Sequence, residues 1–77
     1  MYDRILTGIR RALRENLREY DMKKMEFDRL LGMEDWMLER GNREMAEAYN
    51  QAAGVVGEEL ETLMGRVVRL RALLKAA

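Results

Sequence analysis

The second half of the sequence carries an unbroken heptad repeat of apolar residues. Between Ala46 and Leu74, all nine positions that a heptad labels a and d are apolar. They are Ala46, Tyr49, Ala53, Val56, Leu60, Leu63, Val67, Leu70 and Leu74. Spacings of three and four residues place these side chains along one side of an α-helix, and a seam held over four heptads requires a partner helix. The repeat therefore predicts an all-α fold in which this segment packs lengthwise against another helix.

The first half of the chain supplies that partner. One apolar stripe runs through it without slipping in phase, which predicts one long helix. Its members are Tyr2, Ile5, Leu6, Ile9, Ala12, Leu13, Leu17, Tyr20, Phe27, Leu30, Leu31, Met37 and Leu38. Asp3 is placed to cap this helix or to lie in its first turn, where the helix dipole favours an acidic group.

The best break in the chain is Arg40-Gly41-Asn42. Gly is the usual left-handed residue just after a helix end, and Asn can cap the next helix. We therefore expect a single helical-hairpin domain over residues 1–77, with a helix over 3–40, a turn at 41–42 and a helix over 43–75.

Two further breaks remain open from sequence alone. The first helix could end near Asp21-Met22, and the second could be interrupted at Gly54–Gly57, since each glycine costs up to about 1 kcal/mol inside a helix. Against the second break, the heptad repeat passes through this segment, and no residue suited to capping a new helix precedes Glu58.

A hairpin that turns at Gly41-Asn42 pairs large side chains with small ones. Its facing residues have numbers that sum to about 83, which sets Phe27 and Leu30 against the region of Ala53. Two such helices are too thin to cover their apolar sides alone, and a chain of this length usually needs a metal, disulfides or a partner chain. We therefore expect a coiled-coil-like hairpin that dimerises into a four-helix bundle.

The charge distribution favours one orientation for that dimer. Net charge is zero, but residues 1–24 carry +3, residues 25–61 carry −7 and residues 62–77 carry +4. The folded hairpin then has a basic end that holds both termini and an acidic end at the turn. Two hairpins gain by lying head to tail, because charge complementarity of this kind sets orientation.

Composition excludes several kinds of chemistry. The chain has no Cys and no His, which removes disulfides, thiolate metal sites and the commonest zinc ligand, and it also has no Ser. Catalysis by a Ser-His-Asp or Cys-His set is therefore impossible. The absence of cysteine, of a long apolar run and of a signal-peptide core fits a cytoplasmic protein with no membrane segment.

The candidate partner-binding surface lies on the side of the first helix opposite the stripe. This side combines arginines, methionines and the only tryptophan, residue types that are common at binding surfaces and interface hot spots. The residues that we expect to bind a partner are Arg11, Arg18, Met22, Met25, Arg29, Met33 and Trp36. The corresponding side of the second helix offers acidic residues and small hollows, namely Glu44, Glu47, Glu58, Glu61, Gly54, Gly65 and Ala72.

Three interpretations of this surface stay open. It could join copies of the chain, outer face against outer face, or it could bind a different protein. In the third interpretation Met22, Met25, Met33 and Trp36 form a local core after a kink near residue 21. Three polar residues of the first helix, Asn16, Lys23 and Glu34, fall where the heptad expects apolar ones, and they either fix the register or lie at the edge of the stripe.

One carboxylate pattern bears on enzymatic chemistry. The spacing Glu44-x-x-Glu47 and Glu58-x-x-Glu61 resembles, over these four residues only, the acidic motif of all-α nucleotide pyrophosphohydrolases of the MazG type, with Glu61 where that motif has Asp. The resemblance implies a Mg²⁺ site, which requires the pairs to lie on separate helices. We expect no such break, and therefore no enzyme, no metal and no cofactor.

The expected function is protein–protein interaction and self-assembly, as in an adaptor, an inhibitor, a phage-type accessory protein or a designed bundle. The alternative is an RNA- or DNA-binding hairpin dimer. Arg4, Arg11 and Arg18 recur every seven residues and could track phosphates. The architecture resembles that of the Rop-type plasmid hairpin dimers, which bind RNA, although no motif is shared. Zero net charge weighs against a general nucleic-acid binder.

Overall fold

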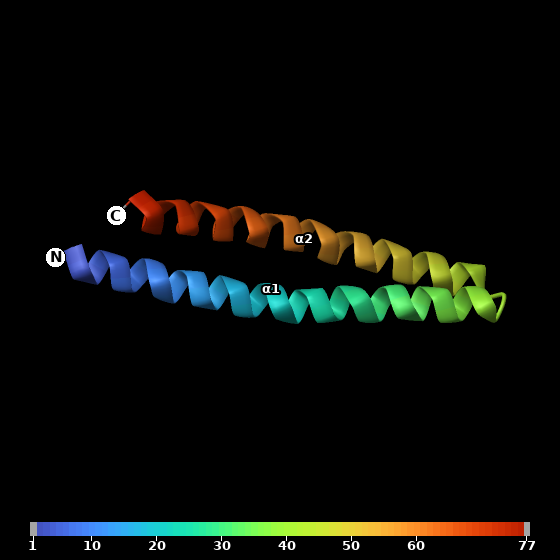
Figure 1. Cartoon of the computed structure of the whole chain (residues 1–77). Helices are drawn as coiled ribbons and strands as arrows, with labels where there is room; N and C mark the ends of the chain where they lie inside the picture. Colours follow the sequence, from blue (N-terminus) through green and yellow to red (C-terminus); the bar gives the residue numbers. More distant parts are fainter. Residues whose placement is uncertain (1, 77) are drawn as a thin grey trace.

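The chain folds into two long antiparallel helices. A computed structural model describes residues 2–76, in which α1 spans Tyr2–Glu39 and α2 spans Arg43–Ala76. Figure 1 shows the helices side by side, with the start of α1 and the end of α2 at the same end of the molecule. The Cα extents are 60 × 14 × 13 Å, and the radius of gyration of 17.4 Å far exceeds the roughly 11.5 Å of a compact domain of this length. The predicted all-α hairpin is confirmed.

The turn closes through hydrogen bonds that the two residues Gly41 and Asn42 make possible. Gly41 has a φ of 77°, and its N–H donates to the carbonyl of Leu38 at 3.0 Å. The N–H of Asn42 donates to the carbonyl of Met37 at 2.9 Å, which completes a Schellman motif. The side-chain oxygen of Asn42 then accepts from the N–H of Met45 at 3.1 Å and caps α2. Both residues act as the sequence predicts.

Three of the four helix bounds differ from the expected ones by one residue, and α2 begins at Arg43 as expected. α1 ends at Glu39 rather than Arg40, because the left-handed Gly41 draws Arg40 into the turn. α1 begins at Tyr2, so Asp3 lies in the first turn rather than capping it. α2 continues one residue beyond Lys75.

The core is a single layer along α2. Six of its nine a and d residues are buried, while Tyr49, Leu70 and Leu74 are half-buried. Leu30 of α1 packs with Ala53, Val56 and Leu60 in the central cluster. The predicted large-on-small pairing therefore holds in this region.

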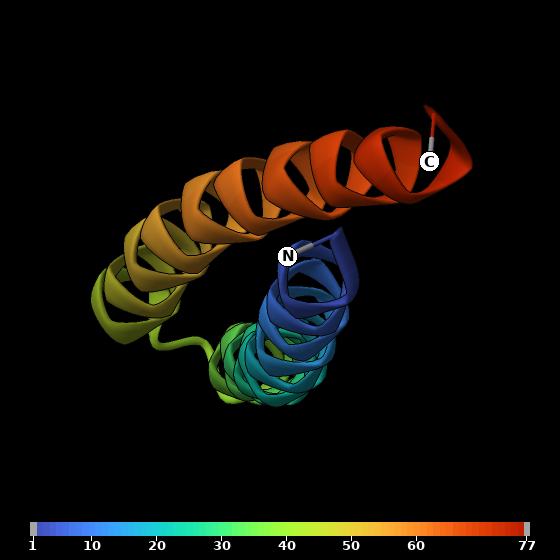
Figure 2. The same ribbon diagram turned by 90° about the vertical axis from the view of Figure 1, so that its left-hand side faces the viewer.

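Figure 2, seen from the end that holds the termini, shows that α2 crosses obliquely over α1. The side of α1 that faces α2 follows its own heptad, from Leu6 and Ile9 at one end to Glu34 and Met37 at the other, and its side chains are half-buried except for the buried Leu30.

Both helices are continuous at the two places where the sequence alone left a break open. α1 runs through Asp21-Met22, and α2 runs through Gly54–Gly57. Gly57 lies against Phe27, because a Cβ added there would lie 3.4 Å from Cε2 of that ring, at ordinary contact distance. The interpretations that required a kink near residue 21 or a break at Gly54–Gly57 are therefore wrong.

α1 is much less covered than α2. Of the thirteen residues in its apolar stripe, Leu30 alone is buried, and Tyr2, Ile5 and Leu38 are exposed. The stripe of α1 is wider than the strip that one neighbouring helix can cover. Each edge of the hairpin therefore keeps apolar surface in contact with solvent.

The turn geometry predicts opposite effects for two glycine-to-alanine changes. Gly41→Ala should lower the free energy of unfolding by about 1 kcal/mol, because alanine is strained at a positive φ. Gly32→Ala should raise it by up to about 1 kcal/mol, because Gly32 is an exposed helical position with nothing within 4 Å of an added Cβ. Urea unfolding at one protein concentration measures both, and equal effects would contradict the assigned turn.

Candidate interaction surface

Six of the seven predicted binding residues separate into two rows along α1, and Met33 lies outside both. Arg11, Arg18 and Met25 are seven residues apart and belong to the outer row, directly opposite the contact with α2. Met22, Arg29 and Trp36 form the edge row, which begins with Gly8 and Glu15. Met33 lies between the edge row and the core and is half-buried, while the other six are exposed. Sequence reasoning did not distinguish these rows, because it had no direction for the packing against α2.

Large apolar side chains stand exposed in both rows. Met25 is 73% exposed and Met22 is 67% exposed. Trp36 is 44% exposed, and the Arg40 guanidinium carbon lies 4.0 Å from the centroid of its ring. This cation–π contact covers part of the indole but leaves nearly half of its surface open. The proposed local core of Met22, Met25, Met33 and Trp36 does not form.

The edge row shares one edge of the hairpin with part of α2. Glu19 of α1 lines a shallow hollow together with Glu59, Thr62 and Arg66 of α2, which shows that these flanks adjoin. By their heptad positions, six of the eleven exposed large hydrophobic residues among those described belong to this edge. We call it the Met22 edge, and the six are Ile5, Met22, Trp36, Met45, Val55 and Leu73.

The opposite edge exposes three such residues, namely Leu38, Met64 and Val68. The Met22 edge is therefore the more apolar of the two.

The outer side of α2 points away from the outer side of α1. Glu44, Glu47, Glu58 and Glu61 are all exposed there. Because the two outer sides lie on opposite faces of one hairpin, they cannot meet within it. An outer-to-outer contact would need a second molecule.

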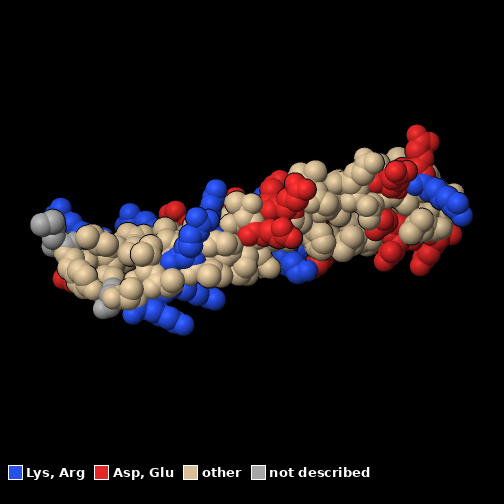
Figure 3. All heavy atoms as spheres, turned by 90° about the horizontal axis from the view of Figure 1, so that it is seen from above, with Lys and Arg blue, Asp and Glu red and all other residues tan. Residues whose placement is uncertain are grey.

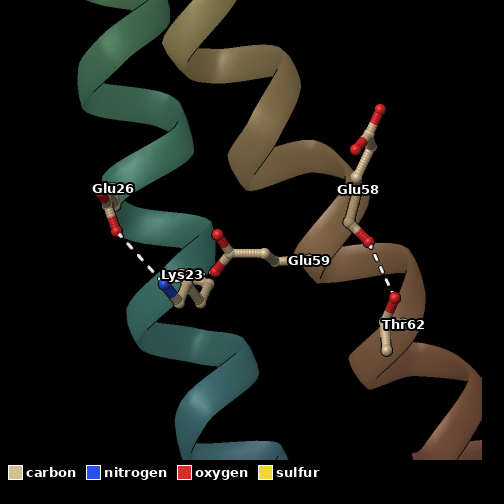
Figure 4. Close-up of polar contacts among 5 residues, drawn as sticks. All are labelled: Lys23, Glu26, Glu58, Glu59 and Thr62. Atoms are coloured by element: carbon tan, nitrogen blue, oxygen red, sulfur yellow. Dashed lines mark hydrogen bonds and ion pairs between the residues drawn. The ribbon is translucent and has the colours of Figure 1, made fainter.

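One ion pair joins the two helices in the described part of the chain. Lys23 of α1 points to Glu59 of α2, and its Nζ also lies 4.0 Å from the carboxylate of Glu26 (Figure 4). The contact lies at the level that the pairing sum predicts. Lys23 occupies a heptad core position, but both side chains are partly exposed, at 30% and 43%, so the pair supports a register that the turn already specifies.

The pKa of Lys23 is raised above its usual value. The main cause is the hydrogen bond to Glu59; desolvation opposes it as the next largest effect, and the negative charges of Glu59, Glu26 and Glu19 add to the rise. The charged ammonium is therefore the favoured form in the folded chain.

The other polar residues at core positions do not join the helices. The Asn16 amide donates to the carbonyl of Ala12 at 2.7 Å, within its own helix. Glu34 is half-buried near the turn. Among the described residues no buried side-chain nitrogen or oxygen lacks a hydrogen-bond partner.

The acidic pairs do not build a metal site. α2 is continuous, so Glu47 and Glu58 are about 16 Å apart along one helix and cannot share an ion. Within residues 2–76 no three Asp or Glu side chains gather closely enough to hold a metal. The resemblance to the MazG-type motif therefore fails on geometry. In the same range, neither helix has a stretch that is both long and apolar enough to cross a bilayer.

Charge separates along the hairpin as the sequence predicts. Figure 3, which looks onto α2, shows Arg and Lys mostly towards the end that holds the termini, and Asp and Glu from the middle to the turn. Because the pairing aligns residues 1–24 with 62–77, the two halves carry +7 and −7.

Comparison with protein-family models, with curated proteins and with solved structures finds no significant match to this chain.

The Lys23–Glu59 pair predicts a specific alkaline loss of stability. A raised pKa in the folded chain means that the contribution of Lys23 is complete below its unfolded value of 10.5 and is lost as the pH rises through the folded value. In a Lys23→Arg variant the guanidinium stays charged over the same pH range.

Urea unfolding from about pH 9 to about pH 11.5 should therefore show a larger fall for the unmodified chain than for Lys23→Arg. Parallel curves would contradict the assigned pair.

Proposed function

We propose that this is a non-enzymatic protein that works through protein–protein interaction, and that two hairpins pair head to tail into an antiparallel four-helix bundle. The half-covered stripe of α1 is the observation that carries the proposal. A helix with apolar residues beyond its contact strip is suited to a bundle in which each helix touches two neighbours.

The exposed area supports pairing. The hairpin exposes 6157 Å². A compact monomer of 9.1 kDa would expose about 4,900 Å². The excess is larger than the roughly 800 Å² per partner that a standard interface buries. The hairpin as a whole therefore exposes more surface than a compact monomer, by more than one standard interface would bury.

Charge supports the head-to-tail direction. A second hairpin laid in the same direction would place two +7 halves together and two −7 halves together. A reversed hairpin places each +7 half beside a −7 half. Attraction of this kind acts over about 10 Å at 0.1 M salt and is screened as salt rises.

Light scattering over a range of concentrations tests the proposal. We expect a species of twice 9.1 kDa whose dissociation constant rises between about 0.05 M and 1 M NaCl, because salt screens the attraction between the halves. A 9.1 kDa species at all concentrations and both salts would overturn it. A dimer that tightens with salt would overturn the head-to-tail direction.

A second candidate function rests on the basic end of the outer row. Arg11, Arg14 and Arg18 line one shallow hollow on α1 together with Glu15. Arg4 and Arg11 line the next together with Asp3. All four arginines are exposed, and none forms an ion pair within the described residues. Such a row fits the phosphates of RNA or DNA.

Fluorescence anisotropy with a labelled RNA duplex tests this candidate at about 0.05 M salt. We expect binding that falls steeply with salt and that an Arg11→Ala, Arg18→Ala double variant weakens by tenfold or more. A Glu44→Ala, Glu47→Ala double variant is the control, because it alters exposed charge at the other end. No binding at low salt would rule the candidate out.

A further inference from the structure

The edge row of α1 is complementary to the edge row of a second copy that runs in the opposite direction. Its five residues are spaced by sevens about Met22, so a second α1 running antiparallel sets Gly8 opposite Trp36 and Glu15 opposite Arg29. Met22 then meets Met22 of the second copy. Each pair is suited to contact, because it sets a small residue against a large one, an acid against a base, or methionine against methionine.

We propose that the Met22 edge is the face on which a second copy of this chain binds, with α1 packed antiparallel on α1 about a two-fold axis at Met22. This proposal rests on the proposed function and specifies its interface. A two-fold axis perpendicular to the helices at this level reverses the hairpin, which is the direction that the charged halves favour.

Neighbouring positions fit the same register. Ala12 falls opposite Met33 of the second copy, which again sets small against large. On α2, where the axis lies near residue 61, Leu73 falls opposite Ala48. Glu19 falls opposite Glu26, which is unfavourable, but Lys23 lies beside Glu26 and offsets part of this repulsion.

Within one hairpin, no contact explains the glycine at position 8, and Glu15 forms no ion pair in the described residues. An added Cβ at Gly8 would have nothing within 4 Å, although a glycine inside a helix costs about 1 kcal/mol. Glu15 has no ion pair in the described residues, and Arg29 lies about 21 Å away from it along α1, beyond the reach of either side chain. A second copy supplies both with a partner.

Cysteine cross-linking tests the face, because the chain contains no cysteine. Met22→Cys should form a disulfide dimer under mild oxidation, since the two-fold axis brings the residue close to its own copy. Asp21→Cys is the matched control at the same level, because its side chain lies towards the opposite edge and should stay monomeric on a non-reducing gel. Both residues are exposed, so neither change disturbs the core.

A charge exchange tests the register. Glu15→Arg alone and Arg29→Glu alone should each weaken the dimer about tenfold, because each places like charges together twice in a symmetric dimer. The double variant Glu15→Arg, Arg29→Glu should restore the affinity of the unmodified chain. Rescue requires contact between copies, since the two residues cannot meet within one hairpin.

The outcomes separate this inference from the function on which it rests. A monomer by light scattering overturns both. A dimer in which Asp21→Cys cross-links and Met22→Cys does not leaves self-assembly standing and overturns the Met22 edge. A dimer in which Met22→Cys cross-links but the double variant fails to recover overturns the register.

Discussion

The contact between one apolar seam on α2 and the facing side of α1 holds the whole fold. The core is one layer of side chains, and the central cluster of Leu30, Ala53, Val56 and Leu60 is its best-buried part. Everything else is solvent-facing on at least one side. This constraint explains why α2 is well covered and α1 is not, because α2 presents a narrow seam while α1 presents a stripe wider than one helix can cover.

The incomplete cover of α1 connects the fold to the proposed function. The proposed pairing of two hairpins rests on the large excess of exposed area and on the opposite charges of the two halves. The Met22 edge carries twice as many exposed large hydrophobic residues as the opposite edge. The self-complementary order of its edge row further distinguishes it, since such an order suits a two-fold partner more than an unrelated one.

Much of the fold could be predicted from the sequence, because local chemistry determined it. Gly41 and Asn42 specify the turn through backbone conformation and capping, and the pairing register follows from the turn. The Lys23–Glu59 pair also fits this register, but a pattern of apolar residues does not reveal an ion pair.

The division of the candidate surface into an outer row and an edge row could not be predicted in the same way. It depends on where the axis of α2 lies relative to α1, and a stripe as wide as that of α1 fits several directions.

The thinness of the molecule determines how it comes apart. With a cross-section of 14 × 13 Å over Cα atoms and a length of 60 Å, each layer of the hairpin touches only the layers on either side. Loss of structure in such a rod can start at an end and travel inwards, as in repeat proteins. At the turn end the two helices are joined by the chain itself and by the hydrogen bonds of the Schellman motif. At the other end, more than half of the surface of Tyr2 and of Ile5 is exposed to solvent. Fraying should therefore begin at the end that holds the termini and spread towards the turn. Amide protection should accordingly increase from that end towards Leu30.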